Sequence, residues 1–299
     1  MEHFDFGKSG ICDAQPEDRV IDFCLLLMAK YGSKSFAAGT ATVLGSGTWD
    51  GPDGPETVVV AATARHCLMN LFKQFGVAEP RPLIPGLGSP LKPEVPWFLL
   101  GGRETLDGQA LWHSIWHCMW YDDLALIYLR PVNEIAKKTT FEQPVISFFS
   151  PELGTELWGF GFAGCTAVND TTHNFETGAK LTKGQIIQYL AGTRQERLVT
   201  DLPFIDGMSG GPVFWKSRLV GLVSSKLEGG TNFRSFVMRI QMLVHFPIDN
   251  APMLNGRSHA TLQGLAEAGI IATLPTCERS NSVNAVPRFG LEVWTRKAD

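Results

Sequence analysis

Gly207-Met208-Ser209-Gly210-Gly211-Pro212-Val213 is the most informative stretch of this 299-residue chain. It places three glycines and a proline around one serine, at the point where a strand pattern resumes. Glycine permits positive φ angles and lets the backbone approach a ligand closely. A serine on such a turn is presented at a surface, with backbone N–H groups beside it directed at one spot. The pattern also fits an ordinary glycine turn, but as a functional motif it predicts a nucleophile beside an oxyanion hole.

Two further segments offer a base and an orienting acid for that serine. An apolar run over 57–62 is typical of a buried strand, and His66 follows just past its end, where a side chain can face a cleft. The acidic pair Asp122-Asp123 opens a second apolar run over 124–129. Taken alone, His66 fits an ordinary core or surface histidine, and the acidic pair fits aspartates in a turn. Together with Ser209 they follow the His, Asp, Ser order of one known catalytic triad.

Three motifs resemble those of the chymotrypsin/trypsin-like serine proteases. Residues 63–67, Thr-Ala-Arg-His-Cys, are similar to the histidine motif of that family. Residues 123–126, Asp-Leu-Ala-Leu, are similar to its aspartate motif, and residues 207–212 to its serine motif. Thr200-Asp201, ahead of the serine motif, also resembles the nucleophile region of HtrA-type proteases. The resemblance covers about residues 35 to 245.

The resemblance implies a role for each matching residue. Ser209 would attack the scissile carbonyl, His66 would take its proton, and Asp123, which directly precedes the apolar strand, would hold the imidazole. The N–H groups of Gly207 and Ser209 would form the oxyanion hole, where each donor stabilises the transition state by about 3 kcal/mol. Secreted relatives carry an aspartate before the serine that pairs with a new N-terminus, but Met208 stands here. Control by loop ordering or by a regulatory protein partner is therefore expected.

The substrate pocket is predicted from the same matching positions. Pro203 replaces the aspartate that gives trypsin its preference for Arg and Lys, so a basic P1 residue loses its counter-ion. Ser224 lies in the expected pocket wall, and Lys226 and Arg234 place two cations near it. Either cation would favour an acidic P1 residue by direct pairing, or would face solvent as most such side chains do. A small or apolar P1 residue is the other expectation.

Short apolar runs separated by Gly and Pro are typical of an all-β barrel or sandwich. With the resemblance, they predict two six-stranded antiparallel β-barrels with the site in the cleft between them. The expected divisions are an N-terminal barrel over 1–140 with His66 and Asp123, a C-terminal barrel over 141–250 with the nucleophile, and a C-terminal extension over 251–299. The extension is too short for the PDZ domain of HtrA-type proteases. Its candidate helix at 260–268 is expected to pack on the barrels, the alternative being to dock a partner or substrate.

Composition excludes several other classes of protein. The chain is 44% hydrophobic and 19% charged, with a net charge of −4 that argues against a broad nucleic-acid surface. No apolar run approaches the ~20 residues that span a bilayer, and the N-terminus lacks the pattern of a signal peptide. Residues 36–40, which match the strand that pairs its cysteine with the histidine motif in secreted relatives, contain no cysteine. The six cysteines are therefore interpreted as reduced thiols of a cytoplasmic protein.

His113 and His117 lie four residues apart, a spacing that binds zinc when it falls on a helix. No acidic residue lies between them and tryptophans surround them, so neither a metal nor an organic cofactor is expected. The expected function is a serine endopeptidase that acts on protein or peptide substrates, without a nucleic-acid or membrane partner. The alternatives are a pseudo-protease that binds a partner with the same fold, and an esterase. Esterases more often carry Gly-x-Ser-x-Gly with the serine first in chain order.

Overall fold

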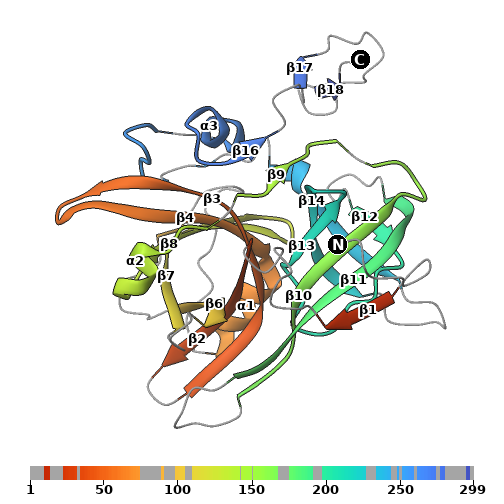
Figure 1. Ribbon diagram of the computed structural model, residues 1–299, viewed down its shortest axis with the longest axis horizontal. Helices are drawn as coiled ribbons and strands as arrows, with labels where there is room; N and C mark the ends of the chain where they lie inside the picture. The colour runs from red at the N-terminus through yellow and green to blue at the C-terminus, as the bar shows by residue number, and fades with distance from the viewer. Residues whose placement is uncertain are drawn as a thin grey trace.

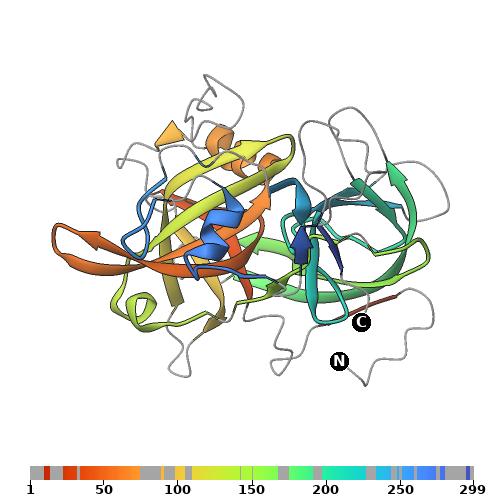
Figure 2. The ribbon, with the colours of Figure 1, turned by 90° about the horizontal axis from the view of Figure 1, so that it is seen from above.

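The strands form two closed barrels that lie side by side (Figure 1, Figure 2), which confirms the predicted two-barrel fold. The computed structural model describes residues 10–13, 23–31, 34–74, 89–90, 98–104, 110–141, 143–149, 151–167, 175–190, 197–226, 234–243, 248, 251–258, 261–273, 277–279 and 294–296. Residues 75–97, whose proline and glycine content predicts a long surface loop, lie outside the described residues apart from 89–90. Residues 289–294, whose apolar pattern predicts a strand, lie outside them apart from Trp294. No helix in the described ranges is long and apolar enough to cross a membrane.

The first barrel has the strand order β7-β6-β2-β3-β4-β8, and β8 pairs back with β7 to close it. Its strands are β2 (Cys24–Tyr31), β3 (Lys34–Gly51), β4 (Gly54–Ala64), β6 (Phe98–Glu104), β7 (Ala110–Tyr121) and β8 (Leu124–Pro131). The short β5 (Ser89–Pro90) adds to the edge of β7. Helix α1 (Arg65–Gln74) follows β4, and helix α2 (Glu134–Lys138) follows β8.

The run predicted as a buried strand places the first two site residues. Residues 58–64 of β4 are all buried, because β4 pairs with β3 on one side and β8 on the other. Such a strand favours β-branched and small apolar residues. Since β4 ends at Ala64, His66 falls in the first turn of α1. Asp123 falls in the two-residue turn that joins β7 to β8, next to β4.

The second barrel has the strand order β13-β10-β11-β12-β15-β14, and β14 pairs back with β13. Its strands are β10 (Glu156–Ala167), β11 (Phe175–Leu190), β12 (Arg197–Thr200), β13 (Pro212–Trp215), β14 (Arg218–Lys226) and β15 (Ser235–Arg239). Three short strands attach to this sheet: β1 (Gly10–Asp13) to β11, β9 (Val145–Ile146) to β14, and β16 (Ala272–Thr273) to β9. The loop at 201–211, between β12 and β13, carries the predicted nucleophile.

After the 3-10 helix η2 (Ile240–Leu243), the chain returns to the first barrel. Helix α3 (Leu262–Glu267) lies over that barrel in Figure 2. Gly45 of β3 forms a bridge with Ile271, and a Cβ on Gly45 would lie 1.8 Å from the Ile270 carbonyl oxygen. Only glycine allows this approach. The described part of 251–273 therefore packs on the barrels, while β17 (Cys277–Arg279) and β18 (Trp294–Arg296) pair with each other.

The larger apolar core joins the two barrels. It fills the first barrel and extends to Phe160 and Phe162 of β10, Met238 of β15, and Leu262 and Ile270 of the C-terminal segment. A smaller core fills the second barrel and includes the side chain of Met208. Burial of apolar surface across the boundary fixes how the barrels meet, and so fixes the cleft between His66 and the nucleophile loop.

Candidate active site

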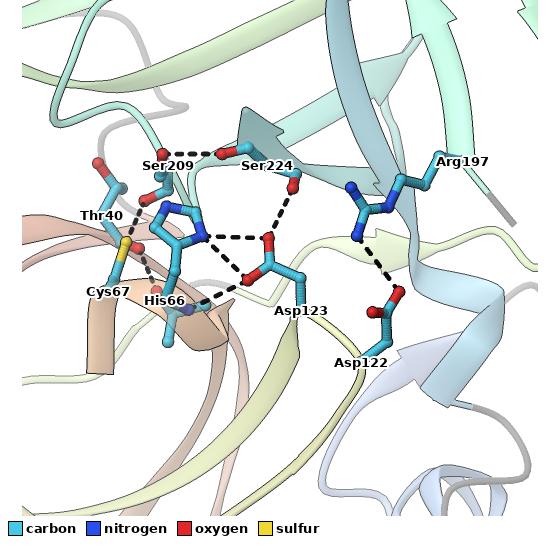
Figure 3. A network of polar contacts seen from close by, with 9 residues as sticks. Thr40, His66, Cys67, Asp122, Asp123, Arg197, Ser209 and Ser224 are labelled. Carbon is cyan, nitrogen blue, oxygen red and sulfur yellow. Dashed lines mark hydrogen bonds and ion pairs between the residues drawn. The ribbon is translucent and has the colours of Figure 1, made fainter. Parts of the chain in front are cut away.

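His66 and Asp123 make direct contact in the cleft (Figure 3). His66 Nδ1 lies 2.9 Å from Asp123 Oδ1 and 3.1 Å from Oδ2, and the His66 N–H donates to Oδ1 at 3.1 Å. The Arg65 N–H donates to the Asp123 carbonyl at 2.7 Å, so the start of α1 is tied to the β7–β8 turn. Because Nδ1 faces the carboxylate, Nε2 is the ring nitrogen left for proton transfer.

The carboxylate of Asp123 has a second donor from the other barrel. The Ser224 hydroxyl of β14 donates to Asp123 Oδ2 at 2.6 Å. Burial raises the pKa of Asp123, but His66 and the Ser224 hydroxyl outweigh this and hold that pKa below its ordinary value. Burial lowers the pKa of His66, but the hydrogen bond to Asp123 and the Cys67 side chain raise it overall, to about 10. Asp123 is therefore ionised and stabilises a protonated imidazole.

Ser209 reaches the cleft from the second barrel. Its carbonyl accepts the Thr40 N–H at 2.8 Å, and the Cys67 thiol contacts the same oxygen at 3.7 Å. Figure 3 shows Ser209 beside the His66 ring, and both side chains line one pocket. The Ser209 hydroxyl, however, donates to the Ser224 carbonyl at 2.9 Å. A change of its side-chain rotamer is needed before it can donate to His66.

The backbone next to Ser209 has the geometry that an oxyanion hole requires. Gly207 has a φ of +99°, and a Cβ there would lie 2.4 Å from the Phe162 carbonyl oxygen, so only glycine fits. Within the described chain, neither the Gly207 nor the Ser209 N–H donates to a protein acceptor. Met208 between them is fully buried, and its N–H donates to the Ile205 carbonyl at 3.1 Å. Two N–H groups are thus free for an anionic oxygen.

A pocket of about 230 Å³ opens beside the nucleophile. The described residues that line it are His66, Phe204, Ile205, Asp206, Ser209, Val223, Ser224 and Ser225. Of the predicted substrate residues, Ser224 lines the pocket. Pro203 is half-buried outside the lining, and Arg234 is exposed and also outside it. Lys226 ends β14, and its side chain lies outside the described part of the structure.

The histidine pair lies on a strand. His113 and His117 are both buried in β7, where His113 packs against Phe141 and His117 against Tyr128. Burial lowers the pKa of His113 to about 4. Among the residues that the structure describes, no three His, Cys, Asp or Glu side chains gather where they could hold a metal ion.

Several contacts at the site had no signal in the sequence. Arg197 of β12 pairs with Asp122 at 3.4 Å and so links the second barrel to the turn that carries Asp123 (Figure 3). Ser224 was predicted as a pocket wall and not as a donor to Asp123. The sequence places Thr40 only in the segment 36–40, which matches a strand of the secreted relatives, and assigns it no contact with the nucleophile loop. Each of these contacts joins residues far apart in sequence, beyond the reach of a local motif.

Similarity to known proteins is visible in the fold. No protein-family model and no curated protein matches the chain in sequence. Human heparin binding protein is 14% identical with a TM-score of 0.50, and the match covers 78% of this chain and 92% of that one. An inactivated protease paralogue from the scabies mite is 14% identical with a TM-score of 0.49, covering 78% and 95%. Neuropsin, a serine protease of mouse brain, is 13% identical with a TM-score of 0.48, covering 77% and 93%. The chain has the fold of the chymotrypsin-like serine proteases, as its three motifs predict.

Proposed function

We propose that this protein is a serine endopeptidase that cleaves protein or peptide substrates through an acyl-enzyme on Ser209. The observation that carries the proposal is the 2.9 Å contact of Asp123 with His66, whose side chain lines the same pocket as Ser209. The unused N–H groups of Gly207 and Ser209 support it. Nucleophile, base, orienting acid and oxyanion donors are the parts that acyl transfer requires.

In the proposed reaction, neutral His66 takes the proton of the Ser209 hydroxyl through Nε2 as the oxygen attacks the scissile carbonyl carbon. The carbonyl oxygen becomes anionic and is stabilised by the Gly207 and Ser209 N–H groups. The C–N bond then breaks, and the imidazolium gives its proton to the leaving amine. Water repeats the sequence and releases the acid product from Ser209. Asp123 stays ionised throughout and holds the ring.

The pocket supports a small or apolar P1 residue. Phe204, Ile205 and Val223 supply apolar surface, and no Lys or Arg is among the described residues that line the pocket. An acidic P1 side chain would therefore meet no Lys or Arg partner among these lining residues. Among the side chains that the structure describes, Cys67 and Cys118 are free thiols, and this supports placing the enzyme in a reducing compartment such as the cytoplasm.

One observation favours a second candidate, a pseudo-protease that binds a protein partner without turnover. The Ser209 hydroxyl donates to the Ser224 carbonyl and not to His66. A protein held in this conformation would bind a partner without turnover. A regulatory partner or a rearranged loop that turned the hydroxyl toward His66 would instead make the protein a regulated endopeptidase.

A peptide library from a digested proteome tests the proposal. Wild type and Ser209→Ala are incubated with the library, and new termini are identified by mass spectrometry. We expect cleavage by wild type alone, after small or apolar residues. Equal cleavage by both proteins would assign the activity to a contaminant. A library left intact by folded wild type would favour the pseudo-protease.

A further inference from the structure

Thr40 of β3 holds the nucleophile loop at two points and β10 at a third. Its hydroxyl donates to the Gly207 carbonyl at 3.0 Å and accepts the Phe162 N–H at 2.9 Å. Its own N–H donates to the Ser209 carbonyl at 2.8 Å. Thr40 is fully buried, so water does not compete for these bonds. A buried hydrogen bond whose loss leaves a carbonyl without a partner is costly to break.

The two bonds to the loop go to the carbonyls of Gly207 and Ser209, the two residues whose N–H groups are assigned to the oxyanion hole. The Gly207 carbonyl belongs to the peptide whose N–H, on Met208, donates to the Ile205 carbonyl at 3.1 Å. That peptide is therefore held at both ends. The Ser209 carbonyl is held directly by the Thr40 N–H. Rotation of the loop about Gly207 would break the bond to the Thr40 hydroxyl.

Neighbouring side chains make Thr40 part of a buried hydroxyl network. The Thr63 hydroxyl donates to the Thr40 carbonyl at 2.7 Å, and the Thr42 hydroxyl donates to the Gly210 carbonyl at 2.8 Å. All three threonines are fully buried. Met208 is uncharged and lies in the apolar core of the second barrel, so it contributes no ion pair. Hydroxyl groups from the first barrel thus fix the loop of the second.

We propose that Thr40 is a positioning residue, whose hydroxyl fixes Gly207 so that the oxyanion hole is formed before substrate binds. The effect of Thr40 on the rate of reaction at Ser209 rests on the proposed endopeptidase function. Its effect on the structure, an ordered loop at 205–211, does not rest on that function. The two consequences can therefore be tested separately.

The test compares four forms of the full-length protein. Thr40→Val removes the hydroxyl at nearly constant volume, and Thr40→Ser retains it. Thr182→Val is the matched control, because Thr182 is also fully buried and its hydroxyl donates to a carbonyl outside residues 205–211, that of Gly159 at 3.2 Å. Two readouts are taken: hydrogen exchange of peptides spanning 205–211, and the rate at which a fluorophosphonate probe labels Ser209 over a range of pH.

For Thr40→Val we expect faster exchange at 205–211 and labelling slowed about 10- to 100-fold, less than the roughly 100- to 1000-fold cost of removing an oxyanion donor outright. The pH midpoint of labelling should stay at the wild-type value, because the His66–Asp123 pair is untouched. Thr40→Ser and Thr182→Val should behave like wild type in both readouts. If Thr40→Val does not fold, Thr40→Ala removes the same hydroxyl with a smaller side chain.

If Thr40→Val, or Thr40→Ala in its place, shows the same hydrogen exchange at 205–211 and the same labelling rate as Thr182→Val, the assignment of Thr40 is overturned. A wild-type protein that the probe does not label would instead count against the endopeptidase. In that case the exchange comparison still decides whether Thr40 orders the loop.

Discussion

His66 is the residue whose charge state limits the proposed reaction, because only neutral imidazole can accept the serine proton. Its pKa lies at about 10, above the ordinary 6.5, since Asp123 and Cys67 outweigh the effect of burial. Raising the pH through that value deprotonates the ring. We therefore predict that fluorophosphonate labelling of Ser209 accelerates into the alkaline range, with a midpoint above pH 6.5.

Asp123→Asn provides the control for this pH profile. It removes the negative charge that stabilises the imidazolium, so the midpoint should move down. A wild-type midpoint at or below pH 6.5 would show that the imidazole is not stabilised in its charged form.

The sequence predicts that His66 and Asp123 lie together, but it does not predict how the surrounding hydroxyl groups are directed. The histidine and aspartate motifs each fix a local structure, a strand end and a tight turn, and the two predicted partners lie 2.9 Å apart. The Ser224 hydroxyl reaches Asp123 across 101 residues of chain. The Ser209 rotamer depends on that same strand. Such directions follow from tertiary packing and leave no local pattern.

Strand β7 shows why a spacing of four residues between two histidines does not distinguish a strand from a helix. Residues 111–117 alternate between buried and partly buried positions, as a strand requires. An interval of four returns to the same face of a strand, just as it does on a helix. His113 and His117 therefore both point inward, where they pack against aromatic rings.

His113 should make this barrel sensitive to acid. Its folded-state pKa is about 4, below the ordinary 6.5, because burial disfavours the charged ring. Between these values the unfolded chain binds more protons, so the free energy of unfolding falls as pH falls. From pH 7 to pH 5 the loss from this one group is about 2 kcal/mol.

Denaturant unfolding at the two pH values tests this prediction. His113→Phe retains an aromatic ring beside Phe141 but cannot titrate, so it should lose about 2 kcal/mol less than wild type over the same interval. An identical pH dependence in wild type and variant would show that His113 is not the group responsible.

At the scale of the whole molecule, the site depends on how the two barrels meet. The alternation of apolar runs predicts an all-β barrel or sandwich, because it reflects local strand and turn preferences, and the resemblance of the three motifs to the chymotrypsin/trypsin-like proteases implies the two barrels. The contacts across the cleft were not predictable, since partners such as Thr40 and Gly207 are separated by 167 residues. The shared apolar core brings the two barrels together, and the polar contacts across the cleft then fix how one barrel is positioned against the other.

The Asp122–Arg197 pair is one such contact, and we expect it to couple the barrels. Both side chains are less than one-fifth exposed, at 19% and 15%, so solvent screens the pair only in part. A double-mutant cycle with Asp122→Asn and Arg197→Met should give a coupling free energy of about 0.5–1.5 kcal/mol in unfolding experiments. If the changes in unfolding free energy of the two single variants add up to that of the double variant, the Asp122–Arg197 pair does not couple the barrels.

Covalent labelling by a fluorophosphonate, read by intact mass and peptide mapping, tests directly whether Ser209 is an activated nucleophile. Wild type should gain one phosphonyl group, located on Ser209. Ser209→Ala should gain none, and His66→Ala should react far more slowly, because the hydroxyl then has no base. A folded wild-type protein that gains no label, or is labelled at another residue, would contradict the assignment of Ser209 as an activated nucleophile.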